Sequence, residues 1–181
     1  MWRSVARAIG VPRPAKPARQ NGYARKRDRL DGRLAVSERM NMLWVTRRQI
    51  RVNRTATAWL VRRFIDREAT FRFVEPDEVA VVQAREGAIG FDAPGARYPH
   101  KDAAGRCAFE ALVAEHRPDD AALRAMARIV RGADFADEIG LTPESAGLRA
   151  ISRGFPLVAA DDDETVTRAA FLYDALYAAL R

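Results

Sequence analysis

Apolar and polar positions become regular at Met42, where short apolar runs begin to alternate with helical patterns. The apolar runs predict three strands, at residues 43–45, 71–74 and 88–91. Helical spacing predicts one helix at 54–66 and another at 76–86, which is started by Pro76 and ended by Gly87. Helical crossovers between successive strands indicate parallel pairing with right-handed connections. The first half of the folded region is therefore predicted to be a small, mainly parallel sheet with its helices.

A different pattern follows residue 92, where the strands stop. Proline and glycine mark a long loop from Asp92 to Gly105, and long loops in compact domains are usually functional or disordered. Four helices are predicted beyond this loop, at residues 108–116, 119–130, 143–155 and 161–181. Gly132 is predicted to end the second of them, and Pro143 takes the first position of the third. The predicted fold class is α+β, with a helical C-terminal half.

The predicted helix at 54–66 is apolar on almost every side, which is typical of a helix buried between layers. Placing successive residues about 100° apart puts Arg54 and Arg63 within its apolar sectors. Both guanidinium groups are therefore expected in the interior. A buried cation needs a partner, so the chain must supply a carboxylate, an anion or both.

Composition bounds the class of protein. An apolar fraction of 48% is enough for a real core, and no apolar run approaches the roughly 20 residues that span a bilayer. We therefore predict a protein without a membrane segment. The single cysteine, Cys107, excludes an intramolecular disulfide framework and suits a reducing compartment, so the cytoplasm is the expected location.

The net charge of +7 is confined to the start of the chain. Residues 1–40 hold 11 of the 31 lysines and arginines and 3 of the 24 acidic residues, and the remainder is close to neutral. We therefore divide the chain into a folded domain at 42–181 and a segment at 1–41. That segment is either a basic disordered tail or upstream sequence from a mis-called start. The neutral domain is not expected to bind nucleic acid.

One group of residues could hold a transition metal ion, whose identity the sequence does not give. His100, Cys107 and Glu110 occur within 11 residues and combine borderline, soft and hard donors, and Asp134 is the candidate fourth ligand. Cys107 and Glu110 can face the same way because they lie one helical turn apart. The alternative is structural, with an exposed histidine, a buried apolar cysteine and a solvated glutamate.

The arginines offer a second kind of site, for a tetrahedral oxyanion. Arg54, Arg63 and Arg131 are the candidate donors, because a planar guanidinium matches two anion oxygens at once. In the structural alternative, Glu110 and Asp134 supply the carboxylate partners, and Asp134 pairs with Arg63. Both interpretations can hold in different ligand states.

Four separated segments carry a resemblance to a known family. They are WVTRRQIRVNRTATAWLVRRFID, FDAPGARYPHKDAAGRCAFEALV, IVRGAD and LYDALYAALR, in this order. Together they resemble the C-terminal domain family of the bacterial chromate-resistance protein ChrB, over about residues 43–181. The resemblance implies a chromate-linked, metal-stress context. The family often adds a regulatory or rhodanese-like domain, and this sequence has neither, so the DNA-binding role of longer members is not expected.

The first functional hypothesis is a cytoplasmic binding or sensor domain for chromate, a similar oxyanion or a metal ion. The second is a metal-dependent enzyme that reduces chromate or removes reactive oxygen, although no familiar catalytic motif is present. The third is a nucleic-acid-binding regulator that acts through the basic segment. The sequence leaves open whether there is turnover.

Overall fold

The computed structural model describes residues 42–181, and the predictions made for residues 1–41 lie outside this range. Three parallel strands form the sheet, in the order β2-β1-β3: β1 (Leu43–Arg47), β2 (Thr70–Val74) and β3 (Ile89–Gly90). Within the described range, six α-helices accompany them: α1 (Val52–Leu60), α2 (Glu78–Glu86), α3 (Ala108–His116), α4 (Ala121–Asp134), α5 (Pro143–Val158) and α6 (Asp162–Ala179). The prediction of an α+β fold with a small parallel sheet and a helical C-terminal half is confirmed.

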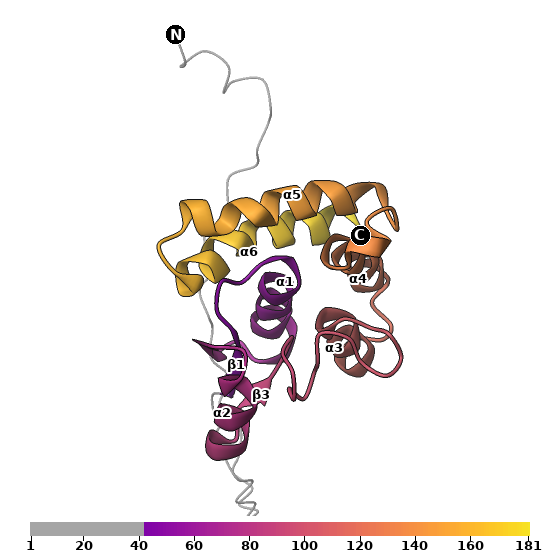
Figure 1. Cartoon of the computed structure of the whole chain (residues 1–181). Helices are drawn as coiled ribbons and strands as arrows, with labels where there is room; N and C mark the ends of the chain where they lie inside the picture. The colour runs from indigo at the N-terminus through magenta and orange to yellow at the C-terminus, as the bar shows by residue number, and fades with distance from the viewer. Residues whose placement is uncertain (1–41) are drawn as a thin grey trace, which may run out of the picture. The chain divides into compact units, whose positions relative to one another are not determined.

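The sheet separates two apolar clusters because successive residues of a strand point to opposite faces. Val45 of β1 packs with Val79 of α2 on one face. Trp44 belongs to the main core on the other face, where α1 contacts α3, α4 and α6. In Figure 1, α5 and α6 lie side by side across one end of the molecule, with α1 between them and the sheet. The central helix is thus buried between layers, as predicted.

The helix that begins as α1 changes its geometry at Val61. Residues Val61–Ile65 form a π-helical turn, η1, which holds more residues per turn than an α-helix and so rotates the side chains that follow. Arg54 lies before this change, and its side chain is 12% exposed. Arg63 lies within the turn, and its side chain is 52% exposed and pairs with Asp174. The expected interior position is therefore confirmed for Arg54 and wrong for Arg63.

Helix α4 continues through Gly132, where the sequence predicted its end. A Cβ atom at this position would come within 2.4 Å of the Ser145 side-chain oxygen and 3.0 Å of the Glu138 carbonyl oxygen. Ser145 is buried and donates a hydrogen bond to the carbonyl of Ile129, so it has little room to move. Gly132 is thus a point of close approach between α4 and α5, and not a helix terminator.

We expect Gly132→Ala to lower the free energy of unfolding by about 1–3 kcal/mol, because the added methyl group overpacks this contact. Gly147→Ala is the matched control, since Gly147 lies within α5 and, apart from the adjacent backbone of its own helix, nothing lies within 4 Å of the place that a methyl group would take. This control should raise stability by about 0.5–1 kcal/mol through helix propensity. Urea denaturation of both variants measures the difference. A Gly132→Ala protein as stable as the wild type would contradict the close approach.

Candidate functional site

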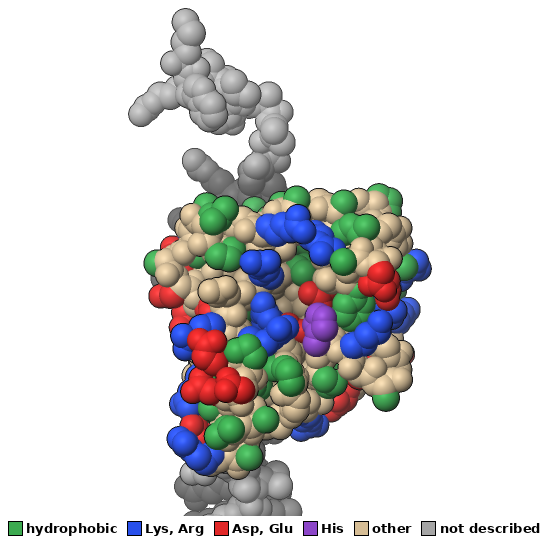
Figure 2. Space-filling model, viewed as in Figure 1, with side chains coloured by type: hydrophobic (Ala, Val, Ile, Leu, Met, Phe, Trp, Pro, Cys, Tyr) green, Lys and Arg blue, Asp and Glu red, His purple; other side chains and the backbone are tan. Residues whose placement is uncertain are grey.

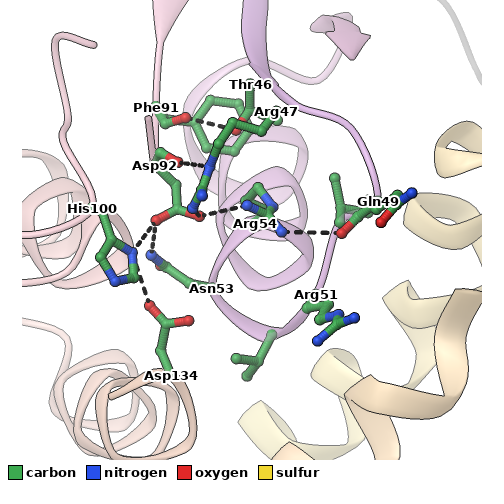
Figure 3. Close-up of polar contacts among 12 residues, drawn as sticks. Thr46, Arg47, Gln49, Arg51, Asn53, Arg54, Phe91, Asp92, His100 and Asp134 are labelled. Carbon is green, nitrogen blue, oxygen red and sulfur yellow. Dashed lines mark hydrogen bonds and ion pairs between the residues drawn. The ribbon is translucent and has the colours of Figure 1, made fainter. Parts of the chain in front are cut away.

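Polar side chains from four parts of the chain meet at the carboxyl ends of β1 and β3 (Figure 3). Arg47 is the last residue of β1, and Asp92 follows β3 by two residues. Asn53 and Arg54 lie in the first turn of α1. The long loop after β3 adds His100, and α4 ends with Asp134. Parallel strands place their carboxyl ends at one edge of a sheet, which is where ligands bind in open α/β sheets.

Asp92 is the centre of this group, and its side chain is only 3% exposed. Its Oδ1 atom accepts hydrogen bonds from Asn53 Nδ2 at 2.9 Å and from His100 Nδ1 at 2.7 Å. Its Oδ2 atom lies 3.1 Å from Arg47 Nη2 and 3.3 Å from Arg54 Nη1. Four donors therefore satisfy a buried carboxylate whose burial would otherwise be costly.

The backbone of Asp92 is also constrained. Its φ of 51° lies in the left-handed region, which aspartate and asparagine enter more readily than most residues. Its amide donates to the carbonyl of Tyr98 at 2.7 Å, and its carbonyl accepts from Arg47 Nε at 2.7 Å. Bonds from two neighbouring segments therefore hold this conformation and point the carboxylate inward.

His100 and Asp134 complete the group on the side toward α4. His100 Nδ1 lies 3.5 Å from Asp134 Oδ2, farther than its partner on Asp92. The hydrogen bond to Asp92 raises the pKa of His100. Burial and the nearby charge of Asp92 raise the pKa of Asp134 to about 6. Within residues 42–181, Asp134 Oδ2 is buried and has no hydrogen-bond partner.

A cavity of about 200 Å³ opens beside these residues. Five arginines line it: Arg47, Arg51, Arg54, Arg149 and Arg153. Asp92 and Asp134 also line it, which leaves an excess of three positive charges. Figure 2 shows Lys and Arg side chains gathered on this face, with a histidine among them. The cavity is therefore suited to an anion.

The arginines of the cavity fall into two sets. Arg47 and Arg54 are paired with Asp92, and burial lowers the pKa of Arg54. Arg51, Arg149 and Arg153 form no ion pair with any residue in the described part of the chain. Arg149 and Arg153 lie one turn apart on α5, so both can point to the same side. The cavity therefore offers three guanidinium groups to a ligand.

Comparison with known proteins places the chain in a family. The family model described as "ChrB, C-terminal domain" matches residues 44–180, which include every residue of the site. The chain belongs to the ChrB C-terminal domain family. Protein ChrB of Cupriavidus metallidurans is 32% identical over 178 residues, which cover 97% of this chain and 50% of that protein. The chain thus spans about half the length of this relative, and the similarity extends into residues 1–41. No solved structure matches.

In this ChrB C-terminal domain, the four predicted metal ligands do not meet as one set. Asp92, His100 and Asp134 offer ligand atoms that all lie within 4.8 Å of one another. Two arginines pair with Asp92, however, and their charge opposes a cation at this position. A metal ion at this group would have to compete with those arginines for the carboxylate.

Cys107 and Glu110, the other two predicted metal ligands, form a capping box at the start of α3. Glu110 Oε2 accepts a hydrogen bond from the Cys107 amide at 3.0 Å. Burial raises the pKa of the Cys107 thiol well above its ordinary value, which disfavours the thiolate that binds metals. The structure gives these two residues a role in ending the loop and beginning the helix.

Of the three predicted oxyanion donors, only Arg54 lines the cavity. Arg63 binds Asp174 at the surface, so its expected pairing with Asp134 is wrong. Arg131 donates from Nη2 to Glu138 Oε1 at 2.8 Å and lies 3.7 Å from Glu110. These ion pairs raise the pKa of Arg131 and occupy its guanidinium group.

Sequence reasoning missed Asp92 and four of the five cavity arginines. Two signals could have found them. Arg47 and Asp92 each stand at the carboxyl end of a predicted parallel strand, where binding residues collect. Arg149 and Arg153 are four residues apart in a predicted helix, which places them on one face of the ChrB domain's α5.

In the part of the chain that the structure describes, no helix combines the length and the apolar composition that a membrane crossing requires.

Proposed function

We propose that this domain serves chromate and metal-stress resistance by binding a tetrahedral oxyanion in the arginine-lined cavity. The observation that carries the proposal is the set of three arginines without ion pairs among the described residues, Arg51, Arg149 and Arg153, around a space of about 200 Å³. Forked guanidinium donors match the oxygens of such anions and bind them with charge-assisted hydrogen bonds. Membership of the ChrB family makes chromate the first anion to test.

Asp92 supports this function by preparing the cavity before a ligand arrives. It fixes Arg47 and Arg54 through its Oδ2 atom, so these side chains lose little conformational freedom when an anion binds nearby. Their charges still add to the positive potential of the cavity. Arg51 and the two arginines of α5 have no ion pair among the described residues to fix them, so their side chains would become ordered when the anion binds. A bound anion would thereby link α5 to the start of α1.

We expect chromate to bind at low ionic strength, and Arg153→Gln to weaken binding by about tenfold, because one charge-assisted contact is lost. Arg149→Gln should act in the same way. Arg128→Gln is the matched control, since it removes the same charge from an exposed position of α4 outside the cavity. Isothermal titration calorimetry of the full chain with each variant measures the affinities.

A metal-dependent redox enzyme remains the second candidate, and the closeness of Asp92, His100 and Asp134 favours it. Elemental analysis, done beside the anion titrations, separates the two candidates. Elemental analysis that finds a metal ion in the purified protein but not in His100→Ala, together with no affinity for chromate, sulfate or phosphate, would overturn oxyanion binding. Equal loss of affinity in Arg153→Gln and Arg128→Gln would show that the anion binds elsewhere.

A further inference from the structure

Asp134 is an unusual residue in the wall of an anion cavity. A site for a fully ionised oxyanion needs donors alone, because a carboxylate repels the ligand and offers it only acceptors. Asp92 does not raise this difficulty, since four donors already occupy its two oxygens. Asp134 does, because its buried Oδ2 atom accepts no hydrogen bond from the described residues.

The residues around Asp134 do not supply the missing hydrogen-bond donor. His100 Nδ1 carries at most one hydrogen, and that hydrogen points to Asp92 Oδ1 at 2.7 Å and not to Asp134 Oδ2 at 3.5 Å. Within residues 42–181, no arginine lies within ion-pair distance of Asp134, although Arg47 and Arg54 are near enough to act on its charge. Oδ2 is enclosed beside His100, so a ligand would meet the other oxygen, Oδ1, which points away from His100 in Figure 3. Asp134 lines the cavity, and the carboxylate therefore offers this oxygen as an acceptor to a bound anion.

We propose that Asp134 makes the cavity select oxyanions that keep a proton, whose own hydroxyl donates to Asp134 while their other oxygens accept from the arginines. This inference rests on the proposed function and adds the class of oxyanion. A fully ionised anion of the same shape would leave Asp134 unpaired and place two negative charges in contact. Such an anion would also strip water from the acceptor at the cavity wall without replacing the lost hydrogen bond, which weakens its binding.

Common tetrahedral oxyanions differ in this property. Hydrogen phosphate and hydrogen arsenate keep a proton in neutral and mildly basic solution, whereas sulfate has none. Chromate exchanges its last proton near neutral pH, so its hydrogen chromate form is the one that fits Asp134.

Phosphate and sulfate at about pH 8 form a matched pair of probes, because both are tetrahedral dianions and only phosphate carries a hydrogen. We expect phosphate to bind the full chain at least about tenfold more tightly than sulfate, from one satisfied acceptor. Asp134→Asn should remove the preference, because the asparagine amide can donate to either anion and the charge is gone. Isothermal titration calorimetry measures both affinities for each protein.

Asp137→Asn is the control, since it removes the same charge from an exposed residue just beyond α4 and should keep the wild-type ratio. Circular dichroism shows whether each variant is folded, and the wild-type ratio decides the question if Asp134→Asn does not fold. Sulfate that binds the wild type as tightly as phosphate would overturn the selection and leave the oxyanion cavity standing. If neither anion binds, the selection fails, and the proposed function fails with it only if chromate does not bind either. A folded Asp134→Asn protein with an unchanged ratio would assign the preference to another group.

Discussion

Replacing Asp92 with alanine is expected to lower the free energy of unfolding by about 3–5 kcal/mol, the cost of breaking a buried ion pair by removing one partner. The carboxylate is 3% exposed and faces the guanidinium groups of Arg47 and Arg54 at 3.1 and 3.3 Å, and its removal would leave both without this counter-charge. Asn53 would also lose its acceptor. Alanine adds a further cost because the φ of 51° is strained for a residue without a short polar side chain.

Asp92→Asn separates these contributions. Asparagine tolerates the left-handed backbone and keeps one acceptor oxygen, so this variant removes the charge and the second acceptor but avoids the backbone strain. We expect a loss of about 1–3 kcal/mol for this variant. Asp119→Ala removes the same charge from an exposed residue and should change stability by less than about 0.5 kcal/mol. Urea denaturation of the three variants tests the order, and a loss below about 1 kcal/mol for Asp92→Ala would show that the arginines find other partners.

Tyr173→Ala should cost about 3–5 kcal/mol, for a different reason. Tyr173 is fully buried on α6 and belongs to the main core. Its hydroxyl donates to the carbonyl of Val52 at 3.0 Å and lies 2.6 Å from Thr55 Oγ1, so it ties the last helix to the first turn of α1. Removing the ring leaves both a cavity and an unsatisfied polar group next to the residues that bind Asp92.

Two further variants separate the contribution of the Tyr173 ring from that of its hydroxyl and from a general effect of truncating a side chain on α6. Tyr173→Phe keeps the ring and removes only the hydroxyl, so we expect a loss of about 1–2 kcal/mol. Phe171→Ala is the control on the same helix, because Phe171 is 81% exposed and its truncation should change stability by less than about 0.5 kcal/mol. Thermal unfolding followed by circular dichroism distinguishes them. Equal losses for Tyr173→Ala and Phe171→Ala would contradict the role of Tyr173 as a core residue.

The general architecture could be predicted from the sequence because it depends on local patterns. Alternation of short apolar runs with helical spacing indicated the parallel sheet, and Gly87 ends α2 with a φ of 66°, as a helix-ending glycine should. Local patterns were misleading where tertiary packing determines the role or the exposure of a residue. Gly132 is explained by its close contact with Ser145 and not by helix termination. Arg63 pairs with Asp174, as the indole of Trp59 does, at a point where this side of the helix reaches the surface.

The candidate site was harder to predict, since its contacts join residues far apart in the chain. Asp92 binds Asn53 and Arg47 across 39 and 45 residues, and no spacing in the sequence reveals such a contact. His100 and Asp134 were predicted from residue type as two of four metal ligands, and the structure places His100 Nδ1 3.5 Å from Asp134 Oδ2. Cys107 was misleading because a soft donor beside a histidine and a glutamate fits a metal site and a helix cap equally well at the level of sequence.

The site also determines how this domain can be divided. Its residues run from Arg47 at the end of β1 to Arg153 in α5, so the sheet unit and the helical half each hold only part of the cavity. A fragment that ends before α5 would keep Asp92 and His100 but lose two of the arginines. The cavity therefore cannot be transferred to another protein as one short segment of sequence. Recombination between related domains would preserve the cavity only if the lining residues of the sheet unit and those of the helical half remained compatible.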